Sequence, residues 1–581
     1  MSNMRFVLLE NASDKVDRVK GVSKPPLCWE FTLKIFFFLL LYISFFTDCL
    51  ITIPSFPGAE GFGSKTRGAF GGSSTPVILK VTNTKDKGKG SLREALMDDR
   101  PRVVIFKTGG NIKLKKDIYV KNPYLTIAGQ TAPSSGICIS NGALRISTHD
   151  VIVRGLRWRN GKERNITRNQ DCISIENYDT PPYNVIVDHC SLSWGSDEIA
   201  VTWFPSHNVT WQWNIISEGL MAYEEHGFGL LVGDDSKNIS IHHNLFAHLK
   251  MRLPECNSNT SGEIINNLMY NFSDKAIDFT SSPTRANFGP MYWNVLKNYF
   301  KRNSEKHNGG CIVIFNYPGW NNGQYYIHDD SKFYIKGNFN HDNPDISDDW
   351  DLVYFFGESS ETEKFKSDTP VTKLSGIKEH PAEEVHNIVL DKVGARVPAL
   401  DPVDKRIIDD VINYTGRIID SVDDDDYPIY SAGIYPEDDD DDGIPNYFEL
   451  LYSESKIGLN PYESAPGDYK WIEEYINSLF PKSIKIEANP ENISSDGTSG
   501  TIIRAEIKDI YDLHAFIKAP VTFELKGPGI FSNNEQIFNT TAINGVANAT
   551  LFSTTKPGTI IVSVSSPNSK PNSVKITSTL H

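Results

Sequence analysis

Three acidic residues and one arginine are spaced so that they can meet at a single site. Asp171 stands just before an apolar strand pattern, and Asp197 and Glu198 follow the next strand and its turn. Arg252 comes shortly after a further strand, in the string Arg-Leu-Pro. Carboxylates on neighbouring strands can share a hard cation, and all-oxygen ligands select Ca2+ or Mg2+. The spacing therefore predicts a cation site beside a lone arginine.

Two other interpretations of these residues stay open. The carboxylates could be the acid/base pair of a glycoside hydrolase, which also needs two of them, or solvated turn residues. Arg252 discriminates, because a guanidinium with a free pKa above about 12 rarely serves a hydrolase as its central group. A calcium ion on a sugar carboxylate acidifies the neighbouring C–H, and a crowded arginine could then take that proton. Otherwise Arg252 only clamps a carboxylate. As a base, it should face the acids across an open groove.

A second candidate metal site lies in an aspartate-rich run near residue 440. Acids recur there at alternate positions, a glycine occupies the sixth position where the chain must turn sharply, and a glutamate occupies the twelfth. This is the ligand pattern of an EF-hand calcium loop. The expected ligands are Asp438, Asp440, Asp442, Ile444 through its carbonyl, and Glu449.

Composition indicates a globular protein that works outside the cell. The 581 residues suggest two to four domains, and the net charge of −15 without a basic tail argues against nucleic acid as a partner. An apolar run over 35–46 follows several lysines, which predicts a signal peptide within 1–52 and no stable membrane span. A retained signal anchor and lipid attachment at Cys49 are the alternatives. We expect a secreted or extracellular monomer, with attachment to the cell surface left open.

The cysteines predict small buried side chains and not a disulfide framework. Cys138, Cys172 and Cys190 each stand inside an apolar strand pattern, and the sequence contains no zinc-type spacing.

Short apolar strands, cut by Gly, Asn and Asp turns, repeat from residue 103 onward. A small or polar residue follows the strands at intervals of 24, 30, 23, 31 and 40 residues: Cys190, Asn214, Asn244, Asn267, Asn298 and Asn338. Stacked coils with loops of variable length give such spacings, and asparagines at equivalent corners can bond from coil to coil. The fold class is therefore predicted to be all-β, a right-handed parallel β-helix. A β-sandwich or a propeller is the alternative, although propeller blades need a more uniform repeat.

Three departures from the strand repeat are expected. Ser91 is an N-cap for a short helix with Glu94 three residues on, and 389–420 turns helical and should pack over the last coils. Residues 482–581 show short alternating strands with frequent turns, which predicts a C-terminal β-sandwich of immunoglobulin (Ig-like) type.

The chain resembles the pectate lyases of polysaccharide lyase family 1 over residues 53–420. The strings that carry the resemblance are Phe56-Pro-Gly-Ala-Glu-Gly-Phe-Gly63, Gly90-Ser-Leu-Arg-Glu-Ala95, Leu125-Thr-Ile-Ala-Gly-Gln-Thr-Ala-Pro133, Val187-Asp-His-Cys-Ser191, Ser196-Asp-Glu198, His242-His-Asn-Leu-Phe-Ala-His248 and Arg252-Leu-Pro254. The 125–133 string looks like the bacterial branch, and the C-terminal hundred residues resemble bacterial invasin/intimin-type domains.

The resemblance implies a parallel β-helix and Ca2+-dependent β-elimination of de-esterified homogalacturonan, the polygalacturonate backbone of pectin. Arg252 falls on the family's proposed catalytic base, and Asp171 and Glu198 fall on calcium ligands, the latter within a one-residue gap. His226 lies near a substrate-binding lysine of the family, and His226 and Lys250 are our candidates for substrate binding.

One departure puts the activity in doubt. A second arginine usually follows the Arg-X-Pro motif, but Glu255 and Asn257 stand at its two usual positions. A non-catalytic pectin-binding adhesin therefore joins the glycoside hydrolase as an alternative. The expected division is a signal segment over 1–52, a lyase domain over 53–422, an acidic linker with the calcium loop over 423–481, and the Ig-like domain over 482–581.

Overall fold

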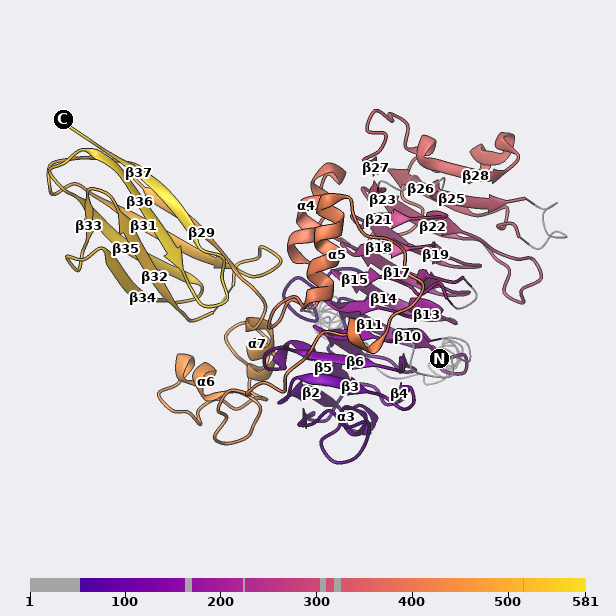
Figure 1. Cartoon of the computed structure of the whole chain (residues 1–581), viewed down its shortest axis with the longest axis horizontal. Coiled ribbons are helices and arrows are strands. Elements are labelled where there is room, and N and C mark those ends of the chain that lie inside the picture. The colour runs from indigo at the N-terminus through magenta and orange to yellow at the C-terminus, as the bar shows by residue number, and fades with distance from the viewer. Residues whose placement is uncertain are drawn as a thin grey trace, which may run out of the picture. The chain divides into compact units, whose positions relative to one another are not determined.

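The described strands from β1 to β28 wind as stacked coils with three parallel sheets (Figure 1). The computed structural model describes residues 53–161, 170–222, 225–303, 310–317, 325–515 and 517–580. The predicted signal peptide lies outside these residues. From β2 onward each coil contributes one strand to each sheet, and β1 adds a further strand to the first. Every strand pair within the three sheets is parallel, for example the pair in which Ile173 lies beside Ala200. The predicted right-handed parallel β-helix is confirmed.

The first sheet contains β1 (Val77–Val81), β2 (Arg102–Phe106), β5 (Leu125–Ala128), β8 (Val151–Arg154), β11 (Tyr183–Asp188), β14 (His207–Gln212), β17 (Lys237–His242), β20 (Ser261–Ile265), β23 (Tyr292–Leu296) and β26 (Lys332–Lys336). The second contains β4 (Ile118–Val120), β7 (Leu144–Ile146), β10 (Ile173–Glu176), β13 (Glu198–Trp203), β16 (Phe228–Val232), β19 (Glu255–Cys256), β22 (Lys275–Phe279), β25 (Gly310–Asn316) and β28 (Val353–Gly357). The third contains β3 (Gly110–Lys113), β6 (Ile137–Ser140), β9 (Arg157–Arg159), β12 (Ser191–Ser193), β15 (Ile215–Ser217), β18 (Leu245–Leu249), β21 (Leu268–Phe272), β24 (Tyr299–Lys301) and β27 (Phe339–Asn340).

The coils enclose one continuous apolar core that all three sheets share. Side chains alternate across each strand, so that Ile277 and Phe279 point into the core while Asp278 between them does not. The cysteines at 138, 172, 190, 256 and 311 are buried and unbonded, as expected for small apolar side chains.

A ladder of asparagines joins the coils at the corner between the first and third sheets. The carboxamide oxygen of Asn244 accepts from the backbone N–H and the side-chain Nδ2 of Asn214, both at 2.9 Å. The carboxamide oxygen of Asn267 accepts from the N–H and the Nδ2 of Asn244, both at 3.0 Å. The oxygen of Asn298 accepts from the same two groups of Asn267. Asn338 continues the ladder. The predicted coil-to-coil bonding is confirmed.

The residue before each ladder position adopts a left-handed backbone conformation. Trp213 has φ 55°, His243 54°, Asn266 52° and Lys297 52°. This conformation costs an L-residue roughly 1–2 kcal/mol, and it turns the chain sharply from the first sheet into the third. The buried asparagine that follows bonds to the neighbouring coil, which holds the turn in place.

In the part of the chain that the structure describes, five α-helices lie outside the coils. They are α3 (Leu92–Met97), α4 (Ala382–Lys392), α5 (Pro402–Asn413), α6 (Asn446–Tyr452) and α7 (Trp471–Ser478). The Ser91 hydroxyl accepts from the N–H of Glu94, which confirms the predicted cap of α3. None of the helices in the described ranges is long and apolar enough to cross a membrane.

Helices α4 and α5 cover the third sheet along its side, and not the last coils alone. Val389 of α4 and Ile407 of α5 belong to one apolar cluster with Ile215 and Leu245 of β15 and β18. Figure 1 shows both helices beside the middle of the stack. The expectation that this segment packs over the last coils holds in part: α4 also contacts β21 and β24, but the surface that the two helices cover is the outer face of the third sheet and reaches back to β15.

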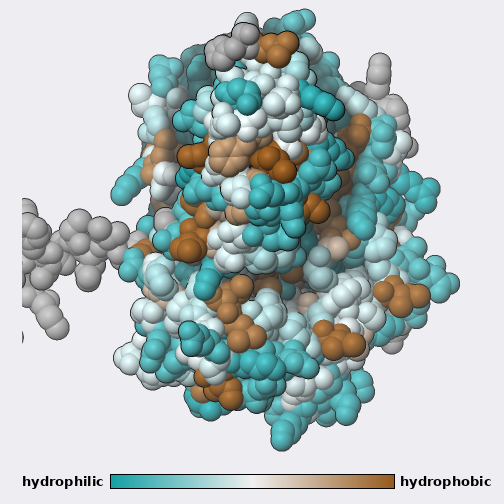
Figure 2. Space-filling model, turned by 90° about the vertical axis from the view of Figure 1, so that its left-hand side faces the viewer, coloured by the Kyte–Doolittle hydropathy of each residue, from teal (hydrophilic) through white to brown (hydrophobic). Residues whose placement is uncertain are grey.

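Two further sheets near the C-terminus share one apolar core. One contains β29 (Ser483–Asn489), β31 (Gly500–Lys508), β35 (Val546–Ser553) and β33 (Gly529–Phe531). The other contains β30 (Asn492–Ser494), β37 (Asn572–Thr579), β36 (Gly558–Ser565), β32 (Ala519–Lys526) and β34 (Ile537–Ala542). Because both sheets contribute to the same buried cluster, this region is a β-sandwich. On the face drawn in Figure 2, apolar residues lie in several separate patches among hydrophilic ones.

The loop of Tyr511 touches the β-helix at a buried acidic residue. The Tyr511 hydroxyl donates to Asp188 at 2.9 Å and accepts from Arg154 at 3.1 Å. Asp188 is fully buried and also bonds to His189 and Gln212. Arg154 and His189 lower the pKa of Asp188 although burial alone would raise it most strongly. Through these contacts Asp188 and His189 join the loop of Tyr511 to the β-helix, which is a structural role.

Candidate functional site

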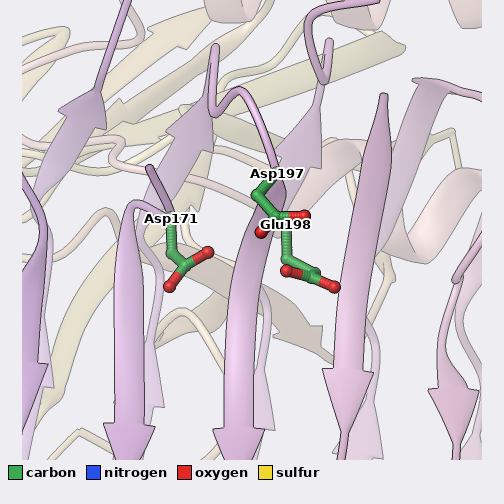
Figure 3. Close-up of side chains that lie close together, drawn as sticks. All are labelled: Asp171, Asp197 and Glu198. Carbon is green, nitrogen blue, oxygen red and sulfur yellow. The ribbon is translucent and has the colours of Figure 1, made fainter. Parts of the chain in front are cut away.

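Asp171 and Glu198 lie side by side because their strands pair in register. Ile173 of β10 pairs with Ala200 of β13, and the N–H of Cys172 donates to the carbonyl of Ile199 at 3.0 Å. The two acids precede these residues by equal steps, at the start of adjacent strands of the second sheet. Figure 3 shows Asp171 on one strand and Asp197 with Glu198 on the next. One oxygen from each of the three carboxylates lies within 4.8 Å of the others.

These carboxylates are crowded and poorly hydrated. Asp171 is 5% exposed and Glu198 is 6% exposed. Burial raises the pKa of Asp171 to about 7, with Arg145 opposing and Asp197 adding to the rise. Burial also raises the pKa of Glu198 well above its usual value, and Arg252 opposes this. Like charges held this closely cannot all ionise without a cation between them, so a divalent ion with oxygen ligands fits the cluster.

Arg252 contacts the carboxylate cluster directly. Its Nη1 donates to Oε1 of Glu198, and its Nε lies 3.1 Å from Oε2 of Glu255. The guanidinium carbon lies 4.0 Å from the ring centroid of Phe228, and the side chain is 20% exposed. We expected a groove between Arg252 and the acids; instead the unlike charges are in contact.

The acidic neighbours stabilise the protonated form of Arg252. Burial alone would lower the pKa of Arg252, but Glu255 and Glu198 outweigh it and raise the pKa above its usual value. A guanidinium that accepts a proton from substrate must first lose one, so the contact with Glu198 works against a role as base. A cation on Glu198 would relieve this.

Of the two predicted substrate-binding residues, His226 contacts the cluster and Lys250 lies close to His226 in the fold. The Nδ1 of His226 lies 2.8 Å from Asp197, and its ring stacks on Phe228 at 4.5 Å. The ammonium of Lys250 donates to the carbonyl of Glu225 at 2.9 Å and is 20% exposed. His226 thus touches a candidate metal ligand, and Lys250 lies one coil further on, since its N–H donates to the carbonyl of Gly227.

Arg145 is a site residue that the sequence reasoning missed. It lies on β7, one strand before Asp171, and its Nη1 lies 3.4 Å from Oδ2 of Asp171. Its Nε donates to Asp117 at 3.0 Å, and Nη1 also pairs with Glu176. These contacts orient Asp171, and the guanidinium of Arg145 favours its ionised form. The coil spacing places Arg145 beside Asp171, but nothing in the surrounding string of letters marks it.

The second predicted site gathers its acids around a sharp turn. Asp438, Asp440 and Asp442 have carboxylate oxygens within 4.8 Å of one another, and Gly443 has φ 101°. A residue with a β-carbon is strained in that backbone conformation, so glycine suits the sixth position. Burial, with Asp440 and Asp438, raises the pKa of Asp442 to about 6.

The twelfth residue of the run is aimed inward. Glu449 is fully buried; its Oε1 accepts from the N–H groups of Gly458 and Leu459 at 2.9 and 3.1 Å, and its Oε2 has no partner. Lys107 lies 2.9 Å from Oδ2 of Asp438, while Oδ1 of Asp438 is buried without a partner. Unpartnered buried carboxylate oxygens are costly, and a calcium ion is a fitting partner for them.

Searches against known proteins connect the chain to one family of enzymes. No protein-family model matches it. The chain is 31% identical over 444 residues to a probable pectate lyase C of Emericella nidulans, covering 74% of this chain and 93% of that protein. It is 30% identical over 452 residues to a probable pectate lyase C of Aspergillus oryzae, covering 75% and 96%.

The chain is also similar, at lower identity, to a plant protein and to a solved structure. Pectate lyase 1 of Ambrosia artemisiifolia is 27% identical over 260 residues, covering 40% of this chain and 61% of that protein. Among solved structures, the cedar pollen allergen Jun a 1 aligns with a TM-score of 0.41 at 21% identity, covering 57% and 90%. The relatives named above are fungal or plant proteins, so the bacterial branch stays a prediction. On the strength of the two fungal relatives, the chain belongs to the pectate lyase family, whose members are polysaccharide lyases.

Proposed function

We propose that this chain is a secreted pectate lyase that cleaves de-esterified homogalacturonan by calcium-assisted β-elimination, with Arg252 as the base. The observation that supports it most is the meeting of Arg252 with a buried acidic cluster, where Asp171 and Glu198 lie close enough to share one ion. The fungal relatives, which are named pectate lyases, support the reaction class.

Asp171, Asp197 and Glu198 would hold the calcium ion. Bound there, Ca2+ supplies positive charge that neutralises a substrate carboxylate and acidifies the adjacent C–H. The three carboxylates would hold the ion beside β10 and β13 of the second sheet, and Arg145 orients the carboxylate of Asp171. His226 and Lys250 would bind the sugar chain beside Arg252, since the N–H of Lys250 bonds to the carbonyl of the residue after His226.

Arg252 would remove the proton from C5 of the uronate. The C–H electron pair would then form the second bond of a C4=C5 double bond, and the bond from C4 to the glycosidic oxygen would break with its electron pair on that oxygen. The oxygen would take a proton from water and leave with the neighbouring sugar as its new reducing end, so the other product is a 4,5-unsaturated uronide. If Glu198 bound a metal ion instead of Arg252, the guanidinium would lose one carboxylate that favours its protonated form and would be a better base.

A direct assay tests the proposal. Incubate the purified protein with polygalacturonate and calcium, and follow the ultraviolet absorbance of unsaturated uronides. We expect signal that EDTA abolishes and that Arg252→Ala reduces by about 10²–10⁴-fold, the usual contribution of a base. Arg100→Ala is a matched control, since Arg100 is an exposed arginine paired with Asp98 at 2.7 Å. Folded, calcium-loaded protein without signal would reject the lyase.

The same assay separates the two other functions. A non-catalytic pectin-binding adhesin is favoured by one observation, the neutralisation of Arg252 by Glu198 and Glu255. It predicts retention on immobilised polygalacturonate without turnover. A glycoside hydrolase predicts saturated reducing ends that form in the presence of EDTA.

We also propose the remaining features expected from the sequence. The Asp438 to Glu449 loop would bind a structural calcium ion, supported by the unpartnered oxygens of both residues. The chain would divide into the lyase domain over 53–422, the linker over 423–481 and an Ig-like domain over 482–581. The β-sandwich is observed, and its immunoglobulin type is the proposal. Calcium loading, secretion and a monomeric state are open to direct measurement.

A further inference from the structure

A lysine stands one coil beyond Arg252 in the second sheet. Glu255 of β19 pairs with Asp278 of β22, and the N–H of Leu253 donates to the carbonyl of Ala276 at 2.9 Å. These bonds tie the residue after Arg252 to the residue after Lys275. Adjacent strands lie about 4.8 Å apart, so Lys275 at the start of β22 lies one coil beyond Arg252, which precedes β19.

Arg252 and Lys275 have the same kind of partner. Each pairs with an acid three residues later: Arg252 Nε with Glu255 at 3.1 Å, and Lys275 Nζ with Asp278 at 2.9 Å. Both acids lie outside the apolar core, since Cys256, Ile277 and Phe279 beside them point inward. We refer to Arg252, Glu255, Lys275 and Asp278 as the charged quartet.

The two basic residues of the quartet differ in how many carboxylates they pair with. Arg252 faces two, Glu198 and Glu255, whereas the ion pair of Lys275 is with Asp278. Burial raises the pKa of Asp278 to about 7, although Lys275 opposes the rise. A basic side chain in an acidic protein is what a polyanion needs for binding.

We propose that Lys275 is a substrate-positioning residue, which binds the carboxylate of the uronate next to the one that Arg252 acts on. It would replace the second arginine that is absent at positions 255 and 257. This inference depends on the proposed function for the identity of the substrate, a polyuronate chain that runs across the coils. The acids of the metal cluster lie on the coils before Arg252, and Lys275 lies on the coil after it.

The other reading is that Lys275 only neutralises Asp278. Both readings predict that removing Lys275 alone destabilises the protein, because a buried carboxylate would lose its partner. Removing both charges avoids this problem. The informative comparison is therefore Asp278→Asn against the double variant Lys275→Met with Asp278→Asn. Lys275 keeps its ammonium in the first and loses it in the second, while neither contains an unpaired Asp278.

The experiment measures lyase kinetics on polygalacturonate and, separately, retention in gels that contain polygalacturonate. We expect the double variant to show a KM about 10- to 100-fold above that of Asp278→Asn, the range of a charge-assisted hydrogen bond, with a smaller change in kcat. Retention should fall in parallel, and Lys275→Arg should keep both. On highly methyl-esterified pectin, where the carboxylate charge is masked, the difference between the variants should shrink.

Lys297→Met is the matched control, since Lys297 pairs with Glu379 at 2.8 Å away from the second sheet and is 37% exposed. Its KM and retention should equal those of the wild type. Equal KM and retention for the double variant and Asp278→Asn would overturn the role of Lys275. Wild-type protein without turnover would reject the proposed lyase instead, and the retention arm would still decide whether Lys275 binds the polyanion.

Discussion

Arg252 and Glu198 neutralise each other across two coils of the β-helix: Nη1 of the arginine donates to Oε1 of the glutamate. The proposed base and a proposed calcium ligand are thus ion-paired. The carboxylate of Glu198 cannot bind a calcium ion at full strength while it is ion-paired with Arg252. Calcium binding and the availability of Arg252 are therefore coupled.

This coupling makes the calcium affinity of Arg252→Ala the first prediction. Removing the guanidinium frees Glu198 for the metal, so we expect turnover to fall while the site binds calcium more tightly, by about tenfold for an ion pair of roughly 1.4 kcal/mol. Calorimetric titration checks this in a background of Asp440→Asn and Asp442→Asn, which removes acids of the second cluster. Weaker calcium binding in Arg252→Ala than in that background would contradict the coupling.

Calcium in the Asp438 to Glu449 loop should stabilise the fold without taking part in the reaction. The loop packs through Ile444 and Phe448 against Val103 and Ile105 of the β-helix. An ion at 100 times its Kd adds about 2.7 kcal/mol. We expect calcium to raise the Tm of the wild type by several degrees more than that of Asp442→Asn.

The kinetics of that variant supply the control. At saturating calcium and below its Tm, Asp442→Asn should turn over polygalacturonate like the wild type, because the aspartate does not belong to the cluster of Asp171. An unchanged calcium-dependent rise in Tm for Asp442→Asn would show that this loop is not the stabilising site.

The asparagine ladder predicts a large effect from one buried amide. Asn244→Ala leaves the N–H of Asn214 without an acceptor and the carbonyl of Trp211 without a donor. Each unsatisfied buried group costs about 1–3 kcal/mol, so we expect about 2–5 kcal/mol of lost stability in urea unfolding. Asn208→Gly, on a half-exposed chain of asparagine contacts with Asn184 and Asn238, should cost under about 1 kcal/mol. Equal losses would contradict the role of the buried ladder.

Acid should weaken the contact between α5 and the coils through Glu218. Burial alone would raise the pKa of Glu218, but Arg406 and the indole of Trp194 outweigh it and lower the pKa. Because the folded pKa lies below the unfolded value of about 4.3, the stabilisation is present above that pH. It disappears as the pH falls through the lower, folded pKa.

Thermal unfolding at a series of pH values measures this effect. Glu218→Gln should lower the Tm near neutral pH and flatten its dependence on pH below about 4.3. Glu487→Gln is the control, since Glu487 is exposed and pairs with Lys485 on the sandwich. A Glu218→Gln profile parallel to the wild type would exclude Glu218 as a source of acid sensitivity.

The sequence predicted the stack well because a period is visible in letters. Asparagines at one corner recur whatever the loops between them do, and the cluster of Asp171 and Glu198 followed from acids at the starts of successive strands. Lys275 could have been found in the same way: it follows Arg252 by the 23 residues that separate Asn244 and Asn267. This interval of one coil is visible in the sequence itself.

Other features were not predictable from the letters alone. The contact between Arg252 and Glu198 depends on the left-handed turn at Arg252, with φ 68°, and on the side chain's direction. The position of α4 and α5 depends on which outer face of the coils is apolar, and all three sheets present buried strands of similar composition. Arg145 lies beside Asp171 only because β7 and β10 pair.

The left-handed turn and its following asparagine have a consequence for how such a chain can change. Intervals of 23 to 40 residues between ladder asparagines are accommodated without any change in the bonds that join them. Extra residues are therefore inserted at the other two corners of the coil. The asparagine corner keeps each coil in the same register with its neighbours. Loops next to the charged quartet could therefore be lengthened to change the ligand that this surface binds. The register of the strands below them would not change.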